Sequence, residues 1–494
     1  MLALGLALLV TPSLAQVVDA EAEVEHPVYQ NAAPRILQGA KRDAEREPLP
    51  ADATQEGVLQ TDRLSSWPRV WQRGGWQVTG SLTGTLGLFR MWNNAFDPPP
   101  AQNPDGNKRN PGWGEFFIEP GLNVEYAPNA ATQLRAGVSY METATRGTDY
   151  GGVSNTYHGG LELLLAGARW QDKAAGVTLD ASYGRQDFAI GHDLLIAAGA
   201  SNGAQRGADY MGPRSAWANA AVVKATVRDV TVQGFWLKPN DSTSADTGTR
   251  LAGVDAHWGG DGPWQAGFLY VRAPESNIVT RDGLDVYAVR GTAKPALGAG
   301  RLTLSGEYVW QRKDGVSASG WYVEGTWQAN RLPWQPLAML RYSSFSGDNP
   351  ATPAWEGFDP LYYGGSTPDW YQGKLGSTLF NNTNLDAFVA SLTLAPNPRN
   401  ILQLIYLYFA AARTNSPLDI PAAGEPAPVG GGVPARALAS EVDAIYTYTF
   451  NKNVNVNAFV GYAAPGAGYK QLYRASGGSA SDWWIVGTQF NVSY

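Results

Sequence analysis

The sequence predicts an all-β protein: a single transmembrane antiparallel β-barrel of about 18 strands, with a polar lumen, long extracellular loops and short periplasmic turns. Residues 487–494 alternate apolar and polar side chains and end on an aromatic residue, as a strand between lipid and a wet lumen requires. The 494 residues include 57 Gly, 18 Trp and 23 Tyr but no Cys. The mean hydropathy is −0.26, and no apolar run is long enough for a membrane helix.

The N-terminal part of the chain differs from the rest. Residues 1–15 have the pattern of a secretory signal peptide, in which a short apolar run precedes small residues at a cleavage site. Residues 16–70 are charged, rich in Ala and Pro, and lack alternation, which indicates a polar periplasmic arm. The arm is either a leader, a plug of the lumen or a segment that binds a periplasmic export partner. The barrel is expected over residues 71–494.

Sustained alternation begins at Trp76. In the first strand Leu82, Leu86 and Leu88 share one face, and Thr83 and Thr85 share the other. The same pattern predicts strands near residues 76–92, 113–127, 132–145, 157–171, 176–190, 215–228, 229–238, 249–258, 263–273, 283–292, 299–312, 319–330, 335–347, 383–395, 400–413, 437–450, 454–464 and 480–494.

The connections between these strands alternate in length. Short ones include residues 171–176, 228–229, 396–399 and 451–453, and long ones include residues 93–112, 191–214, 348–382 and 414–436. Short periplasmic turns and long outer loops are typical of a single-chain barrel with both ends in the periplasm.

Two further patterns fit a membrane wall. Phe490, Val492 and Tyr494 form the lipid face of the closing strand. We expect the barrel-assembly machinery to be a partner of the protein during its insertion. Tryptophans gather near strand ends, where an interfacial girdle would lie: Trp92, Trp170, Trp258, Trp264, Trp310, Trp334, Trp483 and Trp484.

Three ordered stretches carry a family resemblance: residues 184–187, residues 341–348, and residues 358–364, which begin with Phe358, Asp359 and Pro360. Their order and spacing resemble those of the alginate export family of outer-membrane channels, and the resemblance extends from about residue 76 to the C-terminus. It implies a monomeric barrel whose charged lumen passes an acidic polysaccharide. It also implies that Arg185 faces the lumen, although strict alternation points it at lipid, and a bulge at Gly184 would reconcile the two.

The sequence departs from that family in two respects. The late turn at residues 451–453 is too short to cover the pore. Strand parity, the alternation of inward and outward residues along each strand, also places more acids than bases in the lumen. Acids would slow a polyanion unless the bases gather at the constriction. The bases are Arg135, Lys224, Arg341 and Arg413, and the acids are Glu115, Glu119, Glu125, Glu162, Asp180, Asp255, Glu307, Glu324, Glu441 and Asp443.

Other functions have weaker support. A general porin for small neutral or cationic solutes is the alternative if the acids control the pore. The four His lack metal-ligand spacing and have no nucleophile motif beside them, so we expect neither a metal, a cofactor nor a lipid hydrolase. An adhesin would use the long loops. Residues 103–109 fit a solvated loop tip better than a calcium site. The expected partners are outer-membrane lipids and a hydrophilic carbohydrate solute, and the net charge of −7 gives no reason to expect nucleic acid.

Overall fold

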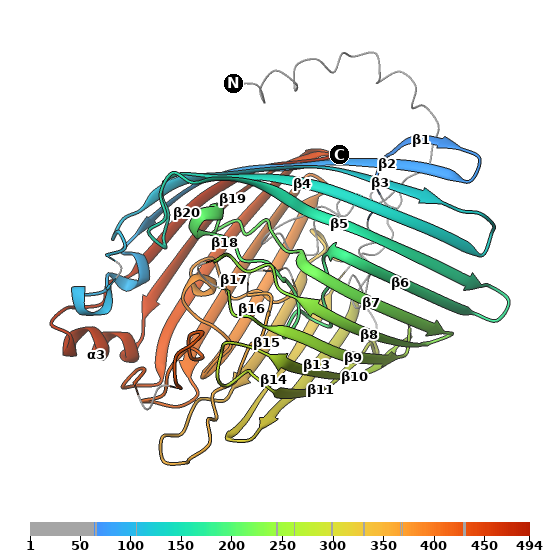
Figure 1. Ribbon diagram of the computed structural model, residues 1–494. Helices are drawn as coiled ribbons and strands as arrows, with labels where there is room; N and C mark the ends of the chain where they lie inside the picture. The colour runs from blue at the N-terminus through green and yellow to red at the C-terminus, as the bar shows by residue number, and fades with distance from the viewer. Residues whose placement is uncertain are drawn as a thin grey trace.

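The computed structural model describes residues 64, 67–104, 106–243, 246–260, 262–297, 300–329, 331–365, 367, 369–427 and 431–494. The predicted signal peptide and most of the predicted arm therefore lie outside the described residues. The strands form one closed antiparallel sheet, in which the last strand pairs with the first strand of the wall through Thr83↔Ser493 and Trp92↔Trp484. Figure 1 shows the resulting barrel, with long loops and α3 (Ala467–Ala475) at one mouth and short turns at the other.

Eighteen strands build the wall, which confirms the predicted architecture and its even strand count. The sheet contains two further short strands, because β1 (Arg69–Arg73) lies beside β2, and β12 (Ala296–Leu297) follows β11 along β13. The wall strands are β2 (Trp76–Trp92), β3 (Gly112–Tyr126), β4 (Thr132–Thr148), β5 (Tyr157–Asp172), β6 (Val177–Gln186), β7 (Trp217–Val227), β8 (Val230–Lys238), β9 (Arg250–Trp258), β10 (Trp264–Glu275), β11 (Leu284–Ala293), β13 (Gly300–Lys313), β14 (Val316–Gln328), β15 (Leu337–Phe345), β16 (Leu385–Asn397), β17 (Asn400–Ala411), β18 (Ala437–Asn451), β19 (Val454–Pro465) and β20 (Trp483–Ser493).

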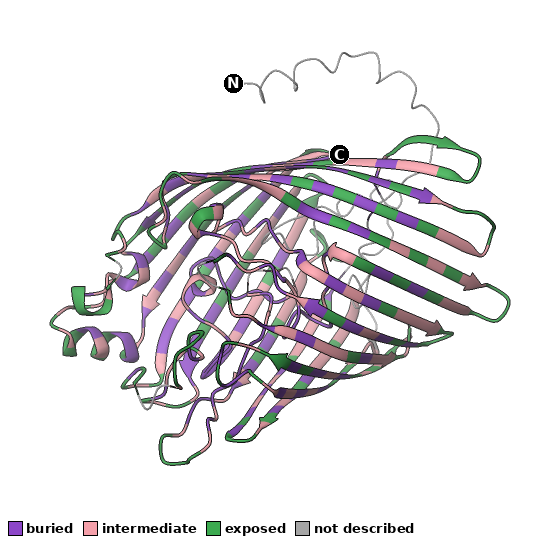
Figure 2. Ribbon diagram, viewed as in Figure 1, coloured by how far each residue is buried: buried purple, intermediate pink, exposed green. Residues whose placement is uncertain are grey.

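Burial alternates along the strands, as the banding in Figure 2 shows. Outward side chains such as Leu88, Leu122 and Phe490 are exposed, because only lipid would cover them. Most of the predicted girdle is exposed too, but Trp483 is not part of it. Its side chain points inward and is buried against Phe96, because it has the opposite parity from Trp484.

The segment before β2 contacts the inside and the seam of the barrel. Leu64 and Trp67 are buried with Leu163, Leu165 and Ala216. Next along the chain, β1 pairs with the part of β2 that β20 does not reach. The described end of the predicted arm is therefore attached to the lumen wall and completes its seam.

Two long loops fold into the barrel rather than away from it. Residues 187–216 join β6 to β7, and residues 346–384 join β15 to β16. Their apolar side chains Phe188, Trp370 and Phe380 belong to the main buried cluster, together with inward residues of the wall such as Phe235 and Phe409. The loops therefore pack the extracellular half of the lumen. No helix among the described residues is long and apolar enough to cross a membrane.

Candidate functional site in the lumen

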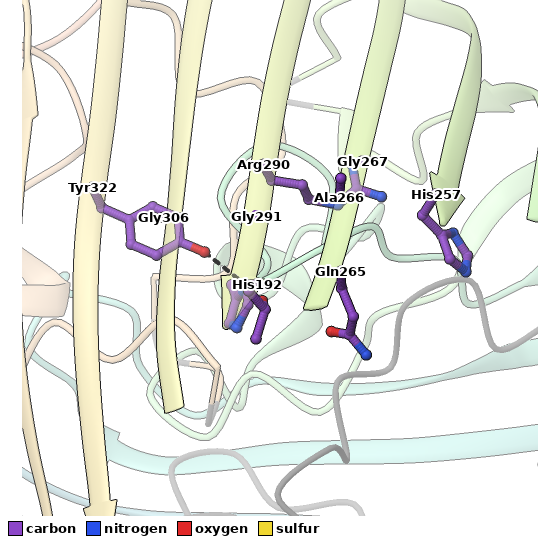
Figure 3. Close-up of a pocket in the computed structure, with 10 residues that line it drawn as sticks. His192, His257, Gln265, Ala266, Gly267, Arg290, Gly291, Gly306 and Tyr322 are labelled. Atoms are coloured by element: carbon purple, nitrogen blue, oxygen red, sulfur yellow. Dashed lines mark hydrogen bonds between the residues drawn. The ribbon is translucent and has the colours of Figure 1, made fainter. Parts of the chain in front are cut away.

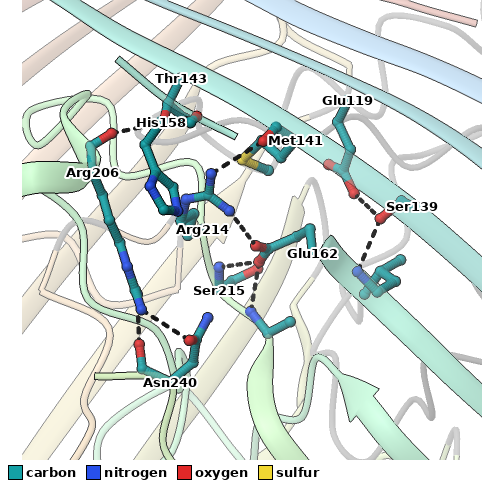
Figure 4. A network of polar contacts seen from close by, with 12 residues as sticks. Glu119, Ser139, Met141, Thr143, His158, Glu162, Arg206, Arg214, Ser215 and Asn240 are labelled. Atoms are coloured by element: carbon teal, nitrogen blue, oxygen red, sulfur yellow. Dashed lines mark hydrogen bonds and ion pairs between the residues drawn. The ribbon is translucent and has the colours of Figure 1, made fainter. Parts of the chain in front are cut away.

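The first inward loop is held by carboxylates of the wall. Glu115 accepts hydrogen bonds from the backbone N–H groups of Tyr210 and Met211, at 3.1 and 2.8 Å. Glu162 accepts two more, from Ser215 and Ala216, both at 2.9 Å, and pairs with Arg214 at 3.2 Å. Figure 4 shows this network around Glu162. Buried backbone donors need partners, and these acids supply them.

The second inward loop is held in the same way from β18. Glu441 accepts the N–H groups of Leu375 and Gly376, both at 2.8 Å. Asp443 accepts the N–H of Lys374 at 3.0 Å and the hydroxyl of Tyr371 at 2.6 Å. Burial lowers the pKa of the Lys374 amine to about 8, although the two carboxylates favour its charged form. Glu441 and Asp443 are therefore anchors of this loop.

The motif at residues 358–360 anchors the second loop at its other end. The Arg281 guanidinium donates to both carboxylate oxygens of Asp359, at 2.9 and 2.7 Å. Gln311, on the wall strand β13, donates to the backbone carbonyl of Asp359 and accepts from its N–H. Phe358 and Pro360 are buried on either side of Asp359, and Phe358 packs on Phe345. In the structure this predicted loop motif holds the loop against the wall.

Arg341 lies beneath the second loop. Its guanidinium stacks on the Trp370 ring, 4.1 Å from the centroid, and donates to the backbone carbonyl of Tyr371. The carboxylate of Glu324, its register partner on β14, lies 3.9 Å away. Arg341 faces inward, as parity predicts, but its charge is directed at the loop and at Glu324.

A row of polar side chains crosses the wall near its short-turn mouth. Register pairs join Arg169 to Asp180, Asp180 to Lys224, Lys224 to Gln233 and Gln233 to Asp255. We call this set, together with two arginines that bind its acids, the polar row. Its members are Arg135, Arg169, Asp180, Lys224, Gln233, Asp255 and Arg290.

The polar row carries more bases than acids. Asp180 accepts from Arg135 at 3.0 Å and from Arg169 at 2.7 Å, and Asp255 accepts from Arg290 at 2.7 Å. Within the row four bases therefore face two acids, and two further acids, Glu125 and Glu307, are the register partners of Arg135 and Arg290. Arg135 and Arg290 are buried, whereas the Arg169 side chain is 25% exposed and Lys224 is half-buried. Arg169 and Lys224 are thus the bases of the row that are accessible from the lumen.

A pocket adjoins the Asp255 end of the polar row. It is lined by His257, Gln265, Arg290 and Thr292 of the wall, and by His192 of the first inward loop. A 2.8 Å hydrogen bond joins His192 Nδ1 to the hydroxyl of Tyr322, as Figure 3 shows. The pocket thus offers several hydrogen-bonding groups and one guanidinium at the point where the first loop reaches the far wall.

The remaining predicted lumen residues occupy different surroundings. Arg185 follows a bulge at Gly184, where φ is +131°, and interacts electrostatically with the buried Glu162 and Arg214. The bulge expected at that position is therefore present. Glu119 is buried and accepts from Ser139 at 2.6 Å. Glu307 is buried across from Arg290.

Arg413 does not lie on the wall. The strand that was expected to reach residue 413 ends at Ala411, so strand parity does not apply to Arg413. Its side chain is 44% exposed in the following loop and pairs with Glu356 at 3.5 Å. We therefore correct its expected position in the lumen to one on the extracellular loops.

Several residues of the site were missed by the sequence analysis. Arg290 lies on a predicted strand with inward parity, so a complete parity count would have found it. Arg169 has the opposite parity from Glu162 and faces inward only because the register shifts at Glu162. His192, Arg281 and Lys374 lie in loops, and nothing in the sequence places those loops inside the barrel. No group of three or more His, Cys, Asp or Glu residues in the described ranges could hold a metal ion. Asp105, the central residue of the loop considered for calcium, lies outside those ranges.

Comparison with known proteins adds two findings. The sequence profile of the alginate export family matches residues 129–482. No curated relative matches the sequence. The fold resembles the outer membrane protein OpdK of Pseudomonas aeruginosa, with 12% identity, a TM-score of 0.51, and coverage of 84% of this chain and 99% of that one. OpdL from the same organism gives 11% identity, a TM-score of 0.51, and coverage of 85% and 98%. At such identities the likeness is one of fold.

Proposed function

Because the chain belongs to the alginate export family of outer-membrane channels, we propose that it passes an acidic polysaccharide or oligosaccharide by passive diffusion through its lumen. The observation that supports this solute is the polar row. Its bases outnumber its acids, and it lies at the mouth that a solute from the periplasm would enter. We assign no catalytic role to any residue of the lumen.

The excess of acids in the lumen does not oppose this proposal, because those acids have other partners. Glu115, Glu162, Glu441 and Asp443 accept backbone N–H groups of the inward loops. Each such bond offsets part of the negative charge locally, since N–H dipoles stabilise a buried carboxylate. The field that a solute meets at the short-turn mouth then depends mainly on Arg169 and Lys224.

We also propose that the two inward loops close the channel in its resting state. The loops at residues 187–216 and 346–384 pack the extracellular half with aromatic side chains. A hydrated polysaccharide cannot cross packed aromatic side chains, so passage requires at least one loop to move. The second loop is the better candidate, because Glu441 and Asp443 accept the backbone N–H groups of three consecutive residues in it, so that loss of two side chains would release a whole segment.

A planar-bilayer experiment tests the choice of solute. A short oligouronate added to the short-turn side should block the channel current at lower concentrations than a neutral oligosaccharide of equal length, because positive charge at that mouth concentrates anions. The blocking should weaken in high salt, which screens the attraction. Equal blocking by both sugars, or a cation-selective channel, would favour a general porin for small neutral or cationic solutes.

A further inference from the structure

An arginine pair lies on the lipid-facing side of the barrel, at the extracellular rim. Arg90 of β2 continues the outward row of Leu86 and Leu88, and Arg146 of β4 continues that of Val138 and Tyr140. Both arginines are exposed. A charged residue on the lipid face needs a reason, although its cost is small near the interface.

The strand between these arginines carries a glycine beside each of them. Arg90 lies opposite Gly112 and Arg146 lies opposite Gly114, both on β3. The Arg90 side chain lies over Gly112, where an added Cβ would be 2.8 Å from Nη1, and the Leu88 side chain lies over Gly114, where an added Cβ would be 3.2 Å from Cδ2. On the outward face β3 therefore places no side chain of its own at these two positions between the arginines, and we call this stretch of β3 the gap.

A third cation borders the gap. The Lys108 ammonium donates to the hydroxyl of Thr148, two residues beyond Arg146, at 2.7 Å. Trp92, whose ring lies 5.9 Å from the Arg90 guanidinium, and its register partner Trp484 are exposed at the same rim. Such tryptophans mark the level of the membrane headgroups.

Acidic residues also lie near this gap. Asp97 pairs with Arg109 at 3.1 Å. Glu142 lies four residues away from Arg146, deeper on the outward face of β4. Within the part of the chain that the structure describes, neither Arg90 nor Arg146 pairs with a carboxylate.

We infer that Arg90, Arg146 and Lys108 form a binding site for the phosphorylated headgroup of a glycolipid in the outer leaflet. Guanidinium groups bind phosphate oxygens in a bidentate manner, and an ammonium adds a point charge. The acyl chains of such a lipid would lie along the apolar outward side chains Leu86, Leu88 and Phe116. The site is independent of what passes through the lumen.

Native mass spectrometry of the full-length protein tests this inference, with an acylated bis-phosphorylated disaccharide as the probe. The R90Q/R146Q variant should retain about tenfold less of this lipid than the natural protein, because it loses two charge-assisted contacts. The R90K/R146K variant, which keeps the charges but not the paired donors, should fall between the two. The control R73Q/R228Q removes the same charge at the short-turn end and should bind as the natural protein does.

Two results would overturn the inference. One is equal retention by R90Q/R146Q and the natural protein. The other is equal binding of the same glycolipid after its phosphates are removed. All three variants change exposed side chains, and migration of the heat-modifiable folded form on gels verifies that each barrel is intact.

Discussion

Replacing Glu441 and Asp443 by alanine is expected to raise the conductance of the channel several-fold. The two carboxylates accept the backbone N–H groups of Lys374, Leu375 and Gly376 in the second inward loop. A hydrogen bond to a charged group contributes about 1.5–3 kcal/mol, so the loss of even two favours the released loop by about a hundredfold. Single-channel recordings in planar bilayers would measure the effect as longer open times or larger steps.

The control for this experiment is Thr447→Ala. Thr447 is buried on the same strand and bonds to Asn457 of the neighbouring wall strand, not to the loop. It should leave the conductance unchanged. If the E441A/D443A barrel folds and conducts like the natural protein, the second loop is not the barrier to flow.

The second large effect is expected from the polar row. The R169Q/K224Q variant removes two of the four positive charges of the row and leaves its acids in place. The reversal potential in a salt gradient should therefore move toward cation selectivity. Arg135 remains to bind Asp180, so the wall itself should stay intact.

A matched variant distinguishes the row from general surface charge. R331Q/R399Q removes two exposed arginines from connections at the same mouth, outside the lumen. It should shift the reversal potential much less than R169Q/K224Q does. Equal shifts in the two variants would mean that the polar row has no special part in selectivity.

The wall could be predicted from the sequence because a membrane barrel imposes one strict period. Lipid on one side and polar groups on the other force alternation, so the strand predicted at residues 76–92 has the same bounds in the structure. The strict alternation is interrupted where the pairing register shifts. At Glu162, for example, the register shifts opposite Ser139 and Tyr140, and two consecutive residues of β5 are buried.

The contents of the lumen could not be predicted in this way. The contacts that fold the loops inward join residues far apart in sequence, such as Met211 to Glu115 and Gly376 to Glu441. No local period marks such pairs. Alternation along the strand assigned Arg341 correctly to the inward face. Nothing in the sequence indicated that Trp370 of the second loop would cover it. The excess of acids became interpretable only once their loop partners were known.

The central claim, that the lumen prefers an acidic saccharide, is tested most directly by efflux from liposomes. Vesicles that contain the natural protein would be loaded with a labelled oligouronate and with a neutral oligosaccharide of the same length, and release of both would be followed together. The account predicts faster release of the oligouronate, a preference that R169Q/K224Q abolishes. Faster release of the neutral sugar, or an oligouronate preference that survives in R169Q/K224Q, would contradict it.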